Sequence, residues 1–304
     1  MAIEIQSQSC QPSQTIQFTF QQAVQNWVVG LGSFKLTYDP GANHWVQTLS
    51  ISLQTNLPML ASVGSNVLEV TVQAQLMDHS GHTVNITNSL ITVVCVAVTG
   101  SSDPETLLAN IAGVTPQEAQ PASLPGIQPV GFSALTTCLS GLDLSYDTTD
   151  HRFQGATAGS GINTQANGTG LVNATANIWD GSGNQAVTAS IDAGVLASIN
   201  DTPPFMLQLV RAQEGLNVPP LSFPSAVGAV GALIQGFNVQ YASDDHVVAN
   251  IVVGCTSATA SGPTVNLTCS ASTTNGEGTF QTDHLSYVNV LVVAVPAASA
   301  AARS

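Results

Sequence analysis

Three histidines stand at the same place in a recurring pattern, each a few residues after a tyrosine and directly after an amide or carboxylate residue. A histidine next to carboxylates is a side-chain set that binds a metal ion or contacts a sugar. The same residues also suit a plain turn, in which the acidic side chain accepts backbone N–H groups. A turn repeated three times favours this architectural role. The candidate binding residues are Tyr38, His44, Trp45, Tyr146, Asp150, His151, Tyr241, Asp244, Asp245 and His246.

Two other turns begin with an aspartate, Asp78 or Asp180, and reach a Ser-Gly pair two residues later. Their carboxylates could supply calcium ligands, but the turns lack the run of carboxylates that a calcium loop presents. His79 and His82 bracket the first turn, and such a pair could in principle bind a transition metal. Because exposed turn histidines usually bind nothing, the pattern favours plain hairpin turns. We expect neither a metal ion nor a cofactor.

The sequence carries none of the motifs that mark common enzyme classes. There is no G-x-S-x-G elbow, no H-E-x-x-H, no P-loop and no G-x-G-x-x-G that opens a helix. A pair of glycosidase-type carboxylates is not recognisable from spacing alone. We therefore predict a non-enzymatic protein without catalytic residues.

The five cysteines, Cys10, Cys95, Cys138, Cys255 and Cys269, show neither C-x-x-C nor zinc-site spacing. Their odd number leaves at least one thiol unpaired within the chain. Cys255 and Cys269 are the only close couple and form a candidate disulfide across neighbouring strands. The favoured alternative is that all five are small buried apolar residues.

A search for internal repeats gives the clearest signal. Residues 33–38, 141–146 and 236–241 share the order small, apolar, any, aliphatic, any, Tyr. Each is followed by a turn, a histidine and an alternating apolar strand. Tyr146 to Asp180 and Tyr241 to Asn275 both span 34 residues, whereas the first copy is longer. The sequence therefore predicts three copies of one unit, of which the middle one closes on a weaker strand.

Period-2 alternation, frequent Val, Ile and Thr, and Gly/Asn/Asp turns predict β-strands throughout. We expect an all-β chain of three tandem, mutually related β-sandwich modules, Ig-like or jelly-roll-like, joined by Pro/Gln/Ala-rich linkers. The expected boundaries are an N-terminal arm or strand at 1–26, module 1 at 27–99, a linker at 100–130, module 2 at 131–200, a linker at 201–229, module 3 at 230–297 and a tail at 298–304.

The two linkers are expected to be extended and to pack along neighbouring modules. A short helix starting near Asp103 is the alternative for part of the first one. Asp103 could cap such a helix, with Pro104 at the first helical position.

The charge balance excludes one large class of partners. The chain of 304 residues has 4 Lys+Arg against 18 Asp+Glu, which gives a formal net charge of −14. Binding to nucleic acid or to an anionic membrane depends on basic residues, so we expect neither. No signal peptide is visible, and the most apolar stretch, 288–302, is too short to span a bilayer. We expect a soluble, acidic protein.

Strand edges are normally protected by charge, especially lysine, and this chain has one lysine, Lys35. Partners are therefore expected to cover the edges, as in a homo-oligomer that also contacts other proteins of a particle. The favoured hypothesis is a structural or decorating subunit of an extracellular particle, such as a phage virion (capsid, tail or fibre) or a contractile injection device. The alternative is a carbohydrate-binding adhesin that presents one weak site per repeat to cell-surface glycans, with gain by avidity.

Overall fold

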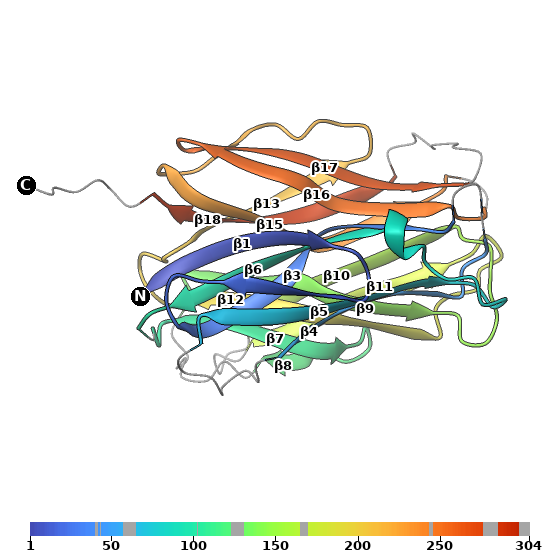
Figure 1. The fold of residues 1–304 in the computed structure, drawn as a ribbon, viewed down its shortest axis with the longest axis horizontal. Coiled ribbons are helices and arrows are strands. Elements are labelled where there is room, and N and C mark those ends of the chain that lie inside the picture. Colours follow the sequence, from blue (N-terminus) through green and yellow to red (C-terminus); the bar gives the residue numbers. More distant parts are fainter. Residues whose placement is uncertain are drawn as a thin grey trace, which may run out of the picture.

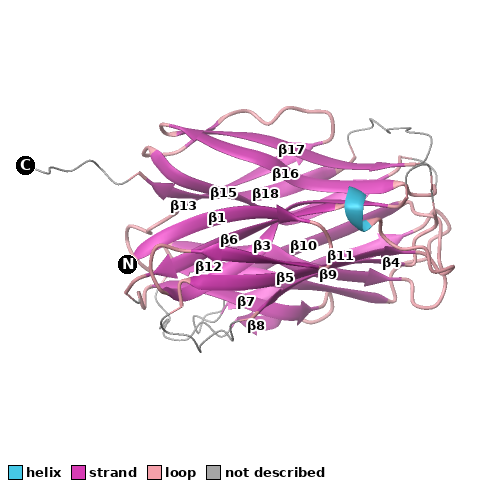
Figure 2. Ribbon diagram, in the orientation of Figure 1, coloured by secondary structure: helices cyan, strands magenta, loops and turns pink. Residues whose placement is uncertain are grey.

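The chain folds almost entirely into antiparallel β-strands (Figures 1 and 2). One short 3₁₀ turn, η1 (Ile86–Asn88), interrupts them. Within the described ranges no helix has the length and apolar character needed to cross a bilayer. The computed structural model describes residues 1–39, 42, 44–56, 65–101, 103–122, 131–164, 170–242, 246–275 and 285–297.

The described strands form three sheets of six strands each. Sheet I has the order β1 (Ala2–Cys10), β6 (Leu90–Thr99), β3 (Val24–Thr37), β16 (Asn250–Ser261), β17 (Thr264–Thr274) and β14 (Leu221–Ser222). Sheet II has the order β2 (Gln14–Thr19), β5 (Val67–Met77), β4 (Thr48–Thr55), β9 (Ala134–Ser145), β12 (Thr188–Ser198) and β7 (Thr106–Val114). Sheet III has the order β13 (Met206–Gln213), β18 (Tyr287–Pro296), β15 (Val227–Gln240), β10 (Gly155–Thr164), β11 (Gly170–Trp179) and β8 (Gln120–Ala122).

Each sheet joins strands from two different thirds of the chain. The junctions are the pairs β3–β16, β9–β4 and β15–β10, which we call the three seams, and each consists of five consecutive residue pairs. Beside each seam lies a register shift in the neighbouring ladder. The shifted ladders are β3–β6, β9–β12 and β15–β18. The strand pairing therefore crosses the expected module boundaries and links all three thirds into one body.

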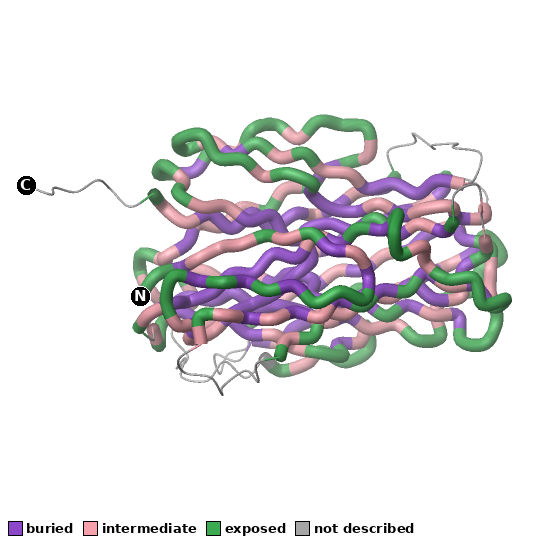
Figure 3. Tube along the Cα trace, viewed as in Figure 1, coloured by how far each residue is buried: buried purple, intermediate pink, exposed green. Residues whose placement is uncertain are grey.

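Near the seams, consecutive apolar residues of the strands are buried, and buried residues concentrate in the inner parts of the strands (Figure 3). The larger cluster fills the space between facing half-sheets and includes Phe18, Phe34 and Phe237. A smaller cluster lies where β3, β9 and β15 contact one another, and includes Val28, Cys138 and Leu233. Close approach at this second cluster requires small residues. A Cβ at Gly30 would lie 2.9 Å from the Cys138 Sγ and 2.6 Å from a methyl carbon of Leu233.

The segments expected to be extended linkers contain edge strands of the three sheets. Strands β7 and β8 lie within 100–130, β13 and β14 lie within 201–229, and β1 and β2 lie within the expected N-terminal arm. The short helix expected as an alternative near Asp103 is wrong. Its residues form β7, which pairs with β12, and alternation then buries Thr106 and Leu108. The Asp103 side chain accepts the N–H of Glu105 in the preceding turn.

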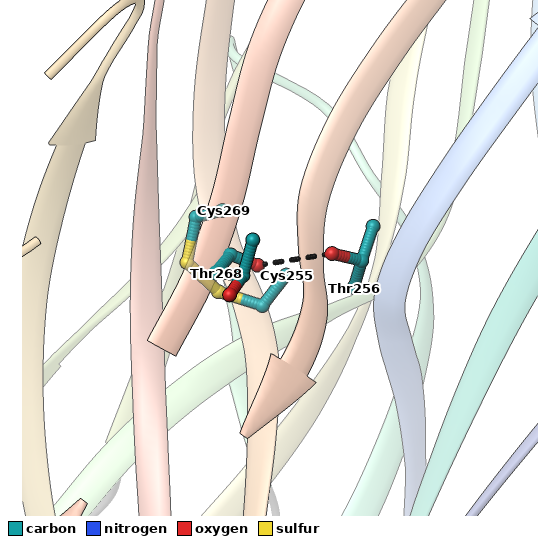
Figure 4. Close-up of a disulfide and its surroundings, with 4 residues drawn as sticks. All are labelled: Cys255, Thr256, Thr268 and Cys269. Carbon is teal, nitrogen blue, oxygen red and sulfur yellow. Dashed lines mark hydrogen bonds between the residues drawn. A yellow bond between two sulfur atoms is a disulfide. The ribbon is translucent and has the colours of Figure 1, made fainter. Parts of the chain in front are cut away.

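A disulfide joins Cys255 and Cys269, which face each other in the register between β16 and β17 (Figure 4). At the register shift next to the disulfide, Thr256 Oγ1 donates to the carbonyl of Thr268 at 3.3 Å. The remaining cysteines, Cys10, Cys95 and Cys138, are free and buried. The candidate disulfide is therefore present, and the other three cysteines act as small apolar core residues.

Gly254 is the position at the β3–β16 seam where glycine is required. Its φ is +111°, and a Cβ there would meet the Gly32 carbonyl oxygen and lie 2.5 Å from the Ser33 Cα. Because the obstacles are backbone atoms of the partner strand, we expect Gly254→Ala to lower the free energy of unfolding by about 2–3 kcal/mol. Urea denaturation measures the change. Gly161→Ala on β10 is the matched control, since nothing lies within 4 Å of its added methyl group. Equal stability of the two variants would contradict this account of the seam.

Candidate functional site

The recurring Tyr–turn–His segments meet in a closed ring of backbone pairs. The apolar residue two positions after each histidine pairs with the histidine of another segment: Val46 with His151, Phe153 with His246, and Val248 with His44. Each pair exchanges two N–H···O bonds of 2.8–3.0 Å. Val46, Phe153 and Val248 are fully buried. The repeated histidines therefore lie in three isolated β-bridges, which join the three segments to one another.

The three tyrosines support this ring from the core. Each is buried and lies against its own histidine, with ring centroids 4.8 Å apart for Tyr38–His44, 4.5 Å for Tyr146–His151 and 4.6 Å for Tyr241–His246. The Tyr38 hydroxyl donates to the carbonyl of Trp45 at 3.2 Å, and the Tyr241 hydroxyl to that of Val247 at 3.4 Å. Burial raises the pKa of Tyr241 to about 12, so its hydroxyl stays protonated at neutral pH. These tyrosines therefore hold the turns from the core side.

In the first of the three segments, the side chains of two histidines contact the carboxylate of Asp78. His44 Nδ1 lies 3.0 Å and His82 Nδ1 lies 2.8 Å from the same oxygen, Asp78 Oδ2. The other oxygen, Oδ1, accepts the backbone N–H of His82 at 2.9 Å. The rings of His44 and His82 are stacked with centroids 4.0 Å apart. Burial alone would raise the pKa of the Asp78 carboxyl, but the hydrogen bonds from the His82 side chain and backbone, with the nearby His44, bring it below its usual range.

The second copy repeats the arrangement with one change. His151 Nδ1 lies 2.9 Å from Asp180 Oδ2, and Asn184 takes the place of the second histidine. The Asn184 amide donates to Asp180 Oδ2 at 2.6 Å, and the backbone N–H groups of Ser182 and Asn184 donate to Oδ1. Although burial of the Asp180 carboxyl opposes ionisation, these hydrogen bonds lower its pKa below the usual range.

The third copy differs more. Asn275 stands where the first two copies have Asp78 and Asp180, 34 residues after Tyr241. The Nε2 of His246 is buried and makes no hydrogen bond to the described part of the chain. The predicted binding residues Asp244 and Asp245 lie outside the described residues.

Two predicted residues, Trp45 and Asp150, take no part in the hydrogen bonds between histidine and aspartate side chains. Trp45 is 43% exposed and does not line the pocket beside His44. Asp150 Oδ2 accepts the backbone N–H of His79 at 3.3 Å, which ties the second copy to the Asp78 turn of the first. Both residues lie at the ring without joining an Asp–His cluster.

The sequence pattern alone did not connect His44 with Asp78 and His82, or His151 with Asp180 and Asn184. The signal that could have connected them is the common spacing. In both segments the aspartate directly follows a strand, and a residue whose side chain can donate a hydrogen bond, His82 or Asn184, follows four positions later. A pocket of about 310 Å³ lies beside the first cluster and is lined by Tyr38, His44, His82 and Asn85 among others. Among the described residues, His44, Asp78 and His82 are the one group of three whose ligand atoms all lie within 4.8 Å of one another.

Comparison with protein-family models, with curated proteins and with solved structures finds no match to this chain. The site is therefore interpreted from its geometry alone.

The lowered pKa of Asp180 predicts acid-sensitive stability. A carboxyl whose folded pKa lies below its unfolded value of about 3.9 stabilises the fold above that value and loses the contribution as pH falls through the folded pKa. We expect Asp180→Asn to lower the free energy of unfolding by about 1–3 kcal/mol at pH 7, and by less at pH 3. Denaturant titrations at the two pH values measure the gap, which is the difference in the free energy of unfolding between the wild type and the variant. The exposed Asp201→Asn is the control, and a gap of equal size at both pH values would contradict the assignment.

Proposed function

We propose that the chain consists of three related β-sandwich modules and serves as a non-enzymatic structural subunit that decorates an extracellular particle, such as a phage virion or a contractile injection device. It would act by assembly and by surface presentation. The observation that carries this proposal is the distribution of strand edges. The inner edges are paired with one another at the three seams, whereas the outer strands of each sheet pair on one side within the described chain.

The relatedness of the modules is supported by equivalent contacts at equivalent positions. The three seams have equal length, and each lies beside a register shift. The backbone N–H groups of Tyr38, Tyr146 and Tyr241 each donate to the residue three positions after a histidine of another copy. Half-sheets from the same third face one another, as β9 faces β10 and β11, and β15 faces β16 and β17. Shared ancestry of the three thirds accounts for these correspondences.

The inner edges need no partner, because each seam pairs them within the chain. One outer edge is also partly protected. Side chains of Gln6 and Gln8 on β1 donate to the carbonyls of Thr19 and Gln17 on β2, the first at 2.6 Å. Such side-chain donors occupy carbonyls that an incoming strand would otherwise use.

Strand β13 is an outer edge of sheet III, and its Gln208 side chain donates to the carbonyl of Ser222 on β14 at 2.6 Å. In the described chain it pairs with β18 on one side, and its sequence MLQLVRAQ is mostly apolar. Leu209 is 58% exposed, and the single charge, Arg211, lies over the ring of Tyr287 at 3.4 Å from the centroid. An apolar edge of this kind accepts an added strand from another chain. We therefore assign β13 as the contact through which chains assemble.

The opposite ends of the molecule support a display role. Strand β1 begins and β18 ends at one end, whereas η1 lies at the other end (Figure 1). The N–H of Asn85, which caps η1, donates to the carbonyl of Thr37, one residue before Tyr38. The ring of turns is thus remote from the start of β1 and the end of β18. Attachment near those two strand ends would leave the turns free at the other end of the molecule.

Assembly through β13 predicts a particular oligomer. We expect the purified protein to have a mass above that of one chain in light scattering, and Leu209→Lys to reduce it to the monomer because a buried charge blocks strand addition. Ser7→Lys on β1, the strand whose glutamines contact β2, is the matched control and should leave the mass unchanged. A wild-type protein that is monomeric at high concentration would overturn the proposed self-assembly.

Reductant should not change this mass. The free cysteines Cys10, Cys95 and Cys138 are buried, and the disulfide between Cys255 and Cys269 lies within one chain. A mass that falls on reduction would place a thiol between chains and contradict the strand-addition contact.

A polar groove on sheet II supports a second candidate, the binding of carbohydrate. The groove has a volume of about 270 Å³ and crosses the β9–β4 seam. Burial and the neighbouring Asp192 raise the pKa of the Asp143 carboxyl. Hydroxyl, amide and carboxylate groups close together on a sheet are suited to sugar hydroxyls. The polar lining residues are Ser50, Ser52, Gln73, Gln75, Asp143, Ser190 and Asp192.

A glycan array tests this second candidate. If the groove binds a glycan, Gln75→Ala combined with Asp143→Ala should weaken binding at least about tenfold, since charged hydrogen bonds contribute about 1.5–3 kcal/mol each. Trp45→Ala should not weaken it, because Trp45 lies outside the groove. Loss of binding with Trp45→Ala would move the site to the turns, and an array without signal would remove this candidate.

A further inference from the structure

We propose that His44, Asp78 and His82 form a binding site for one late first-row divalent metal ion, with Zn²⁺ as the ion to test. The ligand atoms are the Nδ1 atoms of both histidines and Oδ2 of Asp78. This assignment goes beyond the structural role proposed above and does not depend on it.

The spacing of the three atoms fits a metal ion. Bonds of about 2.0–2.2 Å from zinc to imidazole nitrogen and carboxylate oxygen place neighbouring ligand atoms about 3–3.5 Å apart. Asp78 Oδ2 already lies 3.0 Å from His44 Nδ1 and 2.8 Å from His82 Nδ1. Both imidazoles point the same nitrogen at the same oxygen. All three ligand atoms lie within 4.8 Å of one another, so local movement of these side chains can bring them around one ion.

Two of the three ligands are held in place by the fold. The backbone of His44 is paired with Val248 in the ring of turns, and its imidazole lies against Tyr38. Asp78 is 4% exposed, and its second oxygen is fixed by the backbone N–H of His82. An outer hydrogen bond of this kind orients a ligating carboxylate and strengthens metal binding. Only the His82 side chain, which is 56% exposed, has to adjust.

The surroundings allow an ion to enter and to keep further ligands. The pocket of about 310 Å³ borders both histidines. Three protein ligands leave at least one position for water or for a group from another molecule, as in open zinc sites. Two imidazoles among three ligands favour zinc, copper or nickel over calcium and magnesium, which prefer oxygen ligands.

The second copy shows that the turn does not need the second histidine. Asn184 occupies the position of His82 and makes the same hydrogen bonds to its aspartate, from its backbone and from its side chain. An amide nitrogen has no lone pair for a metal ion, whereas the deprotonated Nδ1 of an imidazole does. The chain therefore contains a matched pair of clusters, one with three ligands and one with two.

This pair defines the experiment. Isothermal titration of the metal-free full-length protein with Zn²⁺ should show one saturable site per chain, and an excess of Ca²⁺ should not compete. His82→Asn copies the second cluster, so the turn should fold while zinc affinity falls more than about 100-fold. Asn184→His copies the first cluster and should raise the stoichiometry to two. Far-UV circular dichroism confirms that each variant is folded.

His79→Asn is the control, because His79 lies in the same turn but outside the cluster. Its zinc affinity should equal that of the wild type. The proposal is overturned if the wild type shows no saturable zinc binding, if His82→Asn binds as tightly as the wild type, or if His79→Asn removes the site. A stoichiometry of one for Asn184→His would overturn the claim that these three positions suffice.

Discussion

Backbone hydrogen bonds between different thirds of the chain position every other feature of this protein. At each seam a strand from one third continues the sheet of another, and the three His–x–apolar segments then close a ring in which each exchanges bonds with both others. Antiparallel pairing satisfies backbone donors and acceptors that would be costly to bury alone. Because the seams also lie beside the contact of β3, β9 and β15, breaking one seam exposes part of the shared core. The three thirds are therefore coupled in stability although each contributes its own facing half-sheets.

The same coupling explains how so few charges suffice. A chain of three separate sandwiches would carry an open edge on both sides of every sheet, and this chain has one lysine to protect them. Joining the sheets edge to edge removes these inner edges without charged side chains. The periphery still needs protection, and it differs from edge to edge: glutamines on β1 occupy carbonyls of β2, whereas β13 presents Leu209. The exposed Leu209 is the physical reason for proposing an intermolecular contact at β13.

Much of the strand content could be predicted from the sequence, but the pairing between thirds could not. Alternation of apolar residues tells which face of a strand is buried and does not tell which strand lies beside it. Val248 and His44 are paired although about 200 residues separate them, and no local pattern contains that information. The segment after Asp103 has local features of a helix start, and its pairing with β12 overrides them. In the same way, the tyrosine and histidine of each turn were found from their spacing, whereas Asp78 and Asp180 reach them only through the folded sheets.

The differences among the three turns follow from what the fold demands of each position. The residue four places after Asp78 or Asp180 must donate from its backbone and its side chain to that carboxylate, and both His82 and Asn184 do so. Histidine and asparagine thus make equivalent hydrogen bonds here, but they differ in whether the side-chain donor atom can also become a metal ligand. A third ligand can therefore appear in one copy while the same hydrogen bonds form. The ring of turns would also hold ligands for an ion in place. The backbone of His44 is paired with Val248, and Asp78 accepts the backbone N–H of His82, and both contacts already serve the fold. Without an ion the Nδ1 atoms of His44 and His82 hold the turn through their contacts with Asp78, and metal binding would replace these contacts.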